Sequence, residues 1–331
     1  MDSLYLHLQG IDIFIPLIIG IGFCVGFFSG LMGVGGGWLI TPALSLTGLP
    51  MTVSIGTSLT QMIGTSLFAT FRHRKGKNTD FKLGVIIGLS MIVGLQIGKE
   101  LLFTFANNGI SDSVARVLYV IVLGGIGSLM FRNALLEKKS TSQRESVSKT
   151  LEIDVKSWNK FWGPTTSIVS ASSAVPWLAL FMLGSSAGVL SGLMGIGGGF
   201  ILVPSMIYLL GVDTIRAVAT NLICILVASS YGAIIFTGGG QVDFYVVLFL
   251  LCGSFLGSYV GVAMTRLIDA RELKILFSIL VLMASLAMAL AEFGYTNIAK
   301  IIIFSATSGL IVVALSMAFY KKNKGLRAEG S

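Results

Sequence analysis

The sequence predicts an all-α, polytopic integral membrane protein with two inverted repeats of about five helical segments each, one of them short in each repeat, and one extra C-terminal helix. Three observations support this fold class: scarce charge, long apolar runs and an internal repeat. Of the 331 residues, 54% are hydrophobic and 11% are charged, whereas a typical soluble domain has about 25% charged residues. This composition excludes a soluble enzyme, a disordered chain and a nucleic-acid binder.

Nine apolar runs have the length of about 20 residues that a helix needs to cross the hydrocarbon core of a bilayer. These runs are 11–32, 53–71, 82–105, 113–136, 166–193, 214–236, 243–265, 272–292 and 298–320. Two further runs, 37–49 and 199–211, are shorter. At about 1.5 Å per residue, each would reach only about 20 Å as a helix. We therefore expect half-length, broken or re-entrant helices there, and nine to eleven spans in total.

An internal repeat links the two halves of the chain. Residues 29–37 read Ser-Gly-Leu-Met-Gly-Val-Gly-Gly-Gly and recur at 191–199 with a single change, Val to Ile. The similarity continues on both sides of this motif at a nearly constant offset, through the pairs Gly22 and Gly184, Pro42 and Pro204, Thr57 and Thr220, Ser58 and Asn221, and Asp80 and Asp243. Self-similarity at a fixed offset indicates a duplicated structural unit.

The repeat divides the chain into five parts. They are a first transmembrane repeat (1–136), a cytoplasmic linker (137–165), a second transmembrane repeat (166–293), an additional C-terminal transmembrane helix (294–320) and a cytoplasmic tail (321–331). Because Lys and Arg mark cytoplasmic loops, we place the N-terminus outside and the C-terminus in the cytoplasm. This orientation puts 19 of the 23 basic residues inside. The repeats are then inverted in the cell membrane, as in many secondary transporters.

The glycine-rich motifs are the first candidate for a binding site. Glycine permits positive φ and close backbone approach, and a helix that starts there has unpaired N–H groups at the positive end of its dipole. Such a helix end can bind an anion. The alternative roles are a hinge and close helix packing, and packing is the preferred interpretation for the spaced glycines such as Gly22 and Gly26. The six candidate glycines are Gly35, Gly36, Gly37, Gly197, Gly198 and Gly199.

A second candidate is a group of polar side chains on the run that follows each motif. They are Thr57, Ser58 and Gln61 in the first half and Thr220 and Asn221 in the second. An unpaired amide in lipid costs several kcal/mol, so the two amides must face protein or a cavity. Their donors could bind an oxyanion, and the alternative is hydrogen bonding between helices.

The sequence has no catalytic motif and no metal-ligand spacing, so we expect no enzyme activity, no cofactor and no metal. Charged residues are lacking near the middle of every long run, which leaves a proton relay through buried carboxylates without support. An anion would therefore be held by backbone N–H groups and neutral side chains. Cys24, Cys224 and Cys252 are interpreted as small buried hydrophobic residues. A separate hypothesis is a membrane-embedded binding or thiol-handling protein in which one of these cysteines reacts.

These motifs resemble the sulfite exporter TauE/SafE family of membrane transporters. The resemblance is carried by the doubled Gly-Leu-Met-Gly-x-Gly-Gly-Gly, the Pro that follows it, the Thr-Ser-Leu at 57–59 and the Gly-x₃-Asp corners at Gly76/Asp80 and Gly239/Asp243. It covers about 11–136 and 166–292. It implies transport of small sulfur-containing anions and a central site between the halves, formed by the glycine motifs with Thr57, Ser58, Thr220 and Asn221. The long linker, the helix 298–320 and Asn221 in place of a commoner Ser depart from the family's usual form.

The leading hypothesis is therefore a secondary transporter of sulfite, thiosulfate or organosulfonates such as sulfoacetate, working by alternating access. The alternative is a passive anion channel on the same scaffold. The expected partners are a small anionic substrate and the lipid bilayer, and nucleic acid is excluded. A coupling proton or ion and a homodimer are left open by the sequence.

Overall fold

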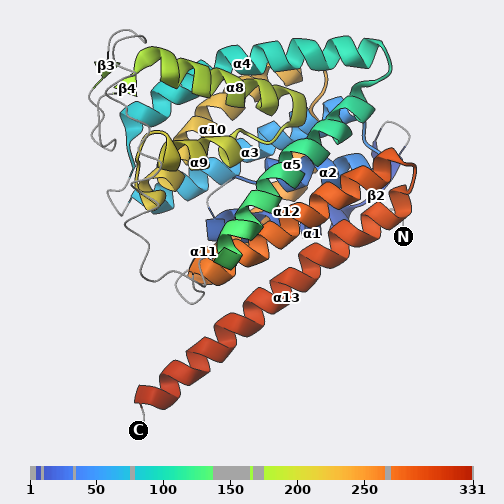
Figure 1. Cartoon of the computed structure of the whole chain (residues 1–331). Coiled ribbons are helices and arrows are strands. Elements are labelled where there is room, and N and C mark those ends of the chain that lie inside the picture. The colour runs from blue at the N-terminus through green and yellow to red at the C-terminus, as the bar shows by residue number, and fades with distance from the viewer. Residues whose placement is uncertain are drawn as a thin grey trace.

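The computed structural model describes residues 5–8, 11–32, 35–74, 79–136, 165–166, 175–264 and 270–329. Helices make up nearly all of this part of the chain, which confirms the all-α class (Figure 1). Two short antiparallel hairpins accompany them, β1 (Tyr5–Leu8) with β2 (Ile11–Phe14) and β3 (Thr165–Thr166) with β4 (Val175–Pro176). The predicted linker 137–165 lies outside the described residues, apart from Thr165.

Each half contributes five helices in the same order. The first half has α1 (Ile15–Met32), α2 (Gly37–Thr47), α3 (Met51–Arg74), α4 (Phe81–Asn107) and α5 (Ser111–Leu136). The second half has α8 (Trp177–Met194), α9 (Gly199–Tyr208), α10 (Thr214–Gly238), α11 (Phe244–Met264) and α12 (Ala270–Glu292). The additional helix is α13 (Thr296–Glu329).

The two short runs form α2 and α9, which have 11 and 10 residues. At about 1.5 Å per residue they are roughly 15 Å long, about half of a hydrocarbon core. The prediction of half-length helices is confirmed. Both helices contain the proline that the repeat pairs, Pro42 in α2 and Pro204 in α9.

Two predicted helix starts are wrong. The run 11–32 becomes helical only at Ile15, because Ile11–Phe14 pairs with β1 as a strand. In the run 166–193, Val175–Pro176 is a strand, and helix α8 begins after it at Trp177. Pro176 caps this helix in an extended conformation, and a residue that precedes a proline is biased away from the helical region. Apolar composition alone does not separate such a hairpin strand from the helix that follows it.

The additional helix extends beyond the apolar run 298–320 that predicted it. α13 continues as a helix to Glu329, through the basic segment that the sequence assigned to a tail. Lys and Arg near a helix C-terminus interact favourably with its dipole, so a basic stretch does not by itself end a helix. In Figure 1, the C-terminal part of α13 projects beyond the other helices.

Seven helices of the described chain are long and apolar enough to cross a membrane, namely α4, α5, α8, α10, α11, α12 and α13. This number is smaller than the nine to eleven spans expected. The apolar part of α1, Ile15–Leu31, is shorter. α3 has 24 residues but is rich in Ser and Thr, and its residues 51–59 are all buried. Because protein surrounds this part of α3, its polar side chains do not have to face lipid.

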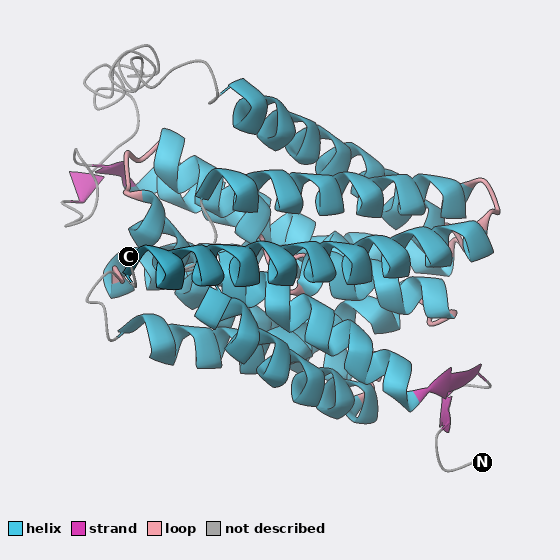
Figure 2. Ribbon diagram, turned by 90° about the horizontal axis from the view of Figure 1, so that it is seen from below, coloured by secondary structure: helices cyan, strands magenta, loops and turns pink. Residues whose placement is uncertain are grey.

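The two halves interlock through reciprocal helix pairs. α1 packs along α11 and α4 packs along α8, so the first helix of each half lies on the fourth helix of the other. Glycines make both contacts close: a Cβ on Gly26 would lie 2.1 Å from the carbonyl oxygen of Ser254, and one on Gly94 would lie 1.9 Å from that of Ser185. These contacts confirm the packing role of the spaced glycines. α3 and α10 pack on each other, as do α5 and α12. Figure 2 shows the helices packed side by side, with the strands near the N-terminus at the edge of the bundle.

Candidate functional site

The two glycine motifs meet inside the helix bundle. α2 begins after the N-cap Gly36, and α9 begins after the N-cap Gly198. A Cβ on Gly37 would lie 2.1 Å from the carbonyl oxygen of Gly195, so one motif lies directly against the other. Because glycine has no side chain to cap a helix, the first N–H groups of α2 and α9 lack the usual side-chain acceptor.

The loop before each short helix uses left-handed backbone that favours glycine. Gly35 and its counterpart Gly197 have φ values of 78° and 74°. A Cβ on Gly35 would lie 3.0 Å from both Met62 and Ile225, and one on Gly197 would lie 2.1 Å from Met62. These two side chains occupy equivalent positions on α3 and α10. The glycine loops are therefore packed around a central pair of apolar side chains.

Thr57 and Thr220 lie in equivalent corner contacts between the halves. The hydroxyl of Thr57 accepts a hydrogen bond from the N–H of Asp243 at 3.2 Å, and that of Thr220 accepts one from the N–H of Asp80 at 3.1 Å. The two carboxylates in turn accept N–H groups at the starts of α11 and α4. This geometry corresponds to the alternative role, which is hydrogen bonding between helices. Each threonine binds the aspartate that precedes the fourth helix of the opposite half.

Ser58 and Gln61 lie beside the first motif. The Ser58 hydroxyl donates to the carbonyl oxygen of Gly195 at 3.3 Å and lies 3.1 Å from a Cβ placed on Gly37. Gln61 donates through Nε2 to Ser254 Oγ at 2.7 Å, and Ser254 donates to the carbonyl oxygen of Gly22 at 3.0 Å. The Gln61 carbonyl oxygen Oε1 lies 3.8 Å from a Cβ placed on Gly36. Ser254 was not predicted as a site residue, although its position next to the regularly spaced glycines of α11 could have indicated a contact between helices.

Several buried polar atoms near the motifs have no hydrogen-bond partner among the described residues, and we call them the orphan atoms. They are Thr41 Oγ1, Gln61 Oε1, Ser191 Oγ, Asn221 Nδ2 and Asn221 Oδ1. Each of these four residues is fully buried. An unsatisfied buried polar atom costs about 1–3 kcal/mol and therefore needs an explanation such as a ligand or a water.

The orphan atoms gather around the glycine motifs. Asn221 lies one helical turn before Ile225, the side chain that contacts Gly35 and Gly197, so both side chains share one face of α10. Thr41 Oγ1 lies 2.7 Å from a Cβ placed on Gly195. Thr41 and Ser191 were not predicted as site residues. Ser191 opens the second motif, which was a usable signal, whereas the position of Thr41 depends on how α2 packs.

Charged residues are found at helix ends rather than at this site. Arg116 at the start of α5 lies 4.0 Å from Asp112 and 3.7 Å from Glu292 at the end of α12. Among the described residues, no group of three or more His, Cys, Asp or Glu side chains could hold a metal. The three cysteines are free; Cys224 is buried as expected, but Cys252 is exposed on α11, so its interpretation as buried is wrong.

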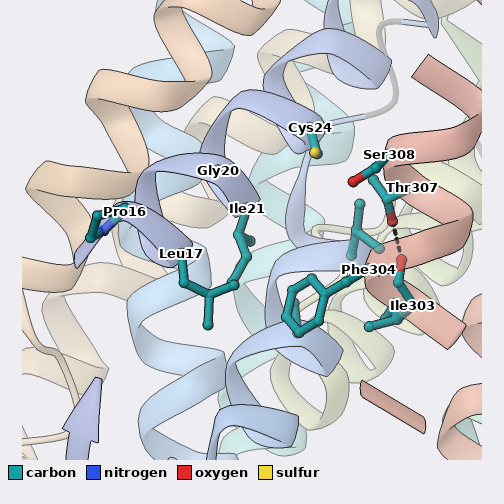
Figure 3. A pocket seen from close by; sticks show the side chains of 11 residues that line it. Pro16, Leu17, Gly20, Ile21, Cys24, Ile303, Phe304, Thr307 and Ser308 are labelled. Atoms are coloured by element: carbon teal, nitrogen blue, oxygen red, sulfur yellow. Dashed lines mark hydrogen bonds between the residues drawn. The ribbon is translucent and has the colours of Figure 1, made fainter. Parts of the chain in front are cut away.

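A separate pocket lies between α1, α2 and α13 (Figure 3). It has a volume of about 200 Å³, and its lining is apolar apart from Cys24, Thr307 and Ser308. The Thr307 hydroxyl hydrogen-bonds to the carbonyl oxygen of Ile303 in its own helix. None of the sequence-predicted site residues lines this pocket. Its composition suits an apolar group better than an anion.

Known proteins similar to this chain are membrane transporters by name. "Probable membrane transporter protein YunE" of Bacillus subtilis is 27% identical over 275 residues, which cover 81% of this chain and 94% of that protein. "Probable membrane transporter protein MJ0441" of Methanocaldococcus jannaschii is 28% identical over 280 residues, covering 80% and 91%. A "Probable membrane transporter protein" of Haemophilus influenzae is 27% identical over 297 residues, covering 86% and 98%. No solved structure matches the chain.

The sequence profile described as "Sulfite exporter TauE/SafE" matches residues 18–288. The match begins within α1 and ends within α12. It therefore covers both halves and leaves out α13. Together with the seven candidate spans, it makes the chain a multi-pass membrane transporter, and the chain belongs to the sulfite exporter TauE/SafE family.

Proposed function

We propose that the protein is a secondary transporter of small sulfur-containing anions, such as sulfite, thiosulfate or organosulfonates like sulfoacetate, across the cytoplasmic membrane. One observation carries the proposal: the glycine motifs that open α2 and α9 meet inside the bundle, and one helical turn from Ile225, which packs on both glycine loops, the fully buried amide of Asn221 has no partner among the described residues. Helix N-termini offer N–H donors and a positive dipole end to an anion. Neutral donors suit a substrate that must also leave the site.

Alternating access would proceed by movement of one half against the other. The loops that carry Gly35 and Gly197 are packed around Met62 and Ile225, so an anion can reach the helix ends only after these side chains move. Discontinuous helices at an interface between repeats are typical of secondary transporters. The distribution of Lys and Arg supports an inverted arrangement with the N-terminus outside and the C-terminus in the cytoplasm. This tight packing favours a transporter over a passive channel, and we expect no enzymatic activity.

Uptake into proteoliposomes tests the substrate class. The purified full-length protein would be offered sulfite, thiosulfate, sulfoacetate, taurine and sulfate, with and without a pH gradient. We expect saturable flux of at least one sulfur-containing anion and a response to the gradient if a proton couples transport. Saturable flux of none of them would contradict the proposal. Conductance that does not saturate would instead support the passive anion channel.

A further inference from the structure

We propose that the substrate must itself carry a hydrogen-bond donor, and that Gln61 Oε1 recognises this donor at the N-terminus of α2. The substrates favoured would be a protonated oxyanion, such as hydrogen sulfite, or a sulfonate that bears a hydroxyl or amino group. A sulfonate without any donor would be disfavoured. This inference rests on the proposed function and narrows its substrate class.

The orientation of the Gln61 amide is fixed by its neighbours. A serine hydroxyl has a single proton, and Ser254 donates it to the carbonyl oxygen of Gly22 at 3.0 Å. The Ser254 oxygen must therefore accept the contact of 2.7 Å from Gln61. Only the NH₂ group of an amide can donate, so Nε2 faces Ser254 and Oε1 faces the opposite way. The usual ambiguity of an amide flip is thus resolved by the hydrogen-bond chain.

The opposite direction is the start of α2. Gln61 Oε1 lies 3.8 Å from a Cβ placed on Gly36, which is the N-cap of this 11-residue helix. Gln61 is fully buried, and no described residue donates to Oε1. A hydrogen-bond acceptor therefore lies beside the donor N–H groups of a helix end. An anion without a donor would use the N–H groups but would be repelled by this oxygen. An anion with a donor satisfies both.

The second half has no amide at the position equivalent to Gln61. Cys224 replaces Gln61 there, and its thiol donates weakly to the carbonyl oxygen of Thr220 at 3.5 Å in its own helix. Met91 replaces Ser254 and lies 2.7 Å from a Cβ placed on Gly198. The Gln61 amide thus has no counterpart at the equivalent position of the second half, where Cys224 offers a matched control position.

The test compares two sulfonates that differ by one hydroxyl group. The purified full-length protein would be titrated with 2-hydroxyethanesulfonate and with ethanesulfonate, which have equal charge. We expect at least about 10-fold tighter binding of the hydroxyl compound, the order of effect of one unsatisfied buried acceptor. Gln61→Met keeps the length of the side chain and removes the amide, so it should reduce the preference to about one. Cys224→Ala should keep the wild-type ratio.

A second variant guards against a folding defect in Gln61→Met. Ser254→Ala leaves Gln61 in place but removes the group that orients its amide, so the preference for the hydroxyl compound should again fall. Equal binding of both sulfonates to the wild-type protein would overturn the inference, as would an unchanged preference in both folded variants. If neither sulfonate binds the wild-type protein and none of the sulfur anions is transported, it is the proposed function that fails.

Discussion

The two equivalent halves of the central site have the same glycine motif but different polar surroundings. In the first half, Ser58 donates to Gly195 and Gln61 donates through Nε2 to Ser254 across the interface, so that Gln61 Oε1 is the one atom of these two side chains without a partner among the described residues. In the second half, Asn221 occupies the position of Ser58, and the described chain offers neither of its amide atoms a partner. The duplicated backbone thus builds two similar helix ends, whereas single substitutions decide which polar groups are left for a ligand.

The largest effect is expected when a substitution forces the two glycine motifs apart. Gly37→Ala would place a methyl group 2.1 Å from the carbonyl oxygen of Gly195. Overpacking of a tight interior typically costs about 1–3 kcal/mol, and here the neighbour is backbone, which cannot rotate away. We expect transport to be lost and the melting temperature to fall in the same variant.

Gly125→Ala is the matched control for that prediction. A Cβ on Gly125 in α5 would meet no atom within 4 Å among the described residues. Alanine stabilises a helix interior by up to about 1 kcal/mol relative to glycine, so this variant should be as stable as the wild type or more so. Wild-type transport by Gly37→Ala would show that the close approach of the motifs is not needed.

Asn221→Ala should have the next largest effect, and it should separate activity from stability. Loss of hydrogen bonds to a charged ligand, worth about 1.5–3 kcal/mol each, should lower anion affinity by at least about 10-fold. Removing an unsatisfied buried amide should leave the melting temperature unchanged or higher. Both quantities can be measured on one preparation by ligand titration and thermal unfolding. Wild-type affinity would show that this amide does not contact the anion.

The corner threonines should give the smallest effect and the most symmetrical one. Thr57→Val and Thr220→Val each remove one acceptor for an aspartate N–H group. We expect each to lower the free energy of unfolding by about 1 kcal/mol and the double variant to be nearly additive, because the two hydrogen bonds have no residue in common. Chemical denaturation in detergent would measure this. A strongly unequal pair would contradict the equivalence of the two corners.

Much of the fold could be predicted from the sequence, because its signals are local. The lengths of the runs 37–49 and 199–211 predicted half-length helices, and the duplicated motif predicted two units of five helices. The late starts at Ile15 and Trp177 could not be predicted, because apolar composition does not distinguish a strand of a hairpin from the first turn of a helix.

The candidate site could be predicted only in part. The repeat made both glycine motifs candidates for the binding site, and the structure places Gly37 against Gly195. The partners of Thr57 and Gln61 lie 186 and 193 residues away in the sequence. No local pattern specifies such pairs, because they depend on how α3 packs against the opposite half. The structure was therefore needed to distinguish a threonine that forms a hydrogen bond between the halves from an amide that has an atom without a partner among the described residues.

Exchange of labelled anion across proteoliposome membranes tests the central claim most directly. Vesicles that contain the purified protein would be loaded with unlabelled sulfite, and the initial rate of uptake of radiolabelled sulfite from outside would be compared with that of empty vesicles. Alternating access around one central site predicts faster uptake in the loaded vesicles, and loss of this acceleration in Asn221→Ala. Equal rates in loaded and empty vesicles, with uptake that does not saturate, would contradict the account and indicate a passive channel.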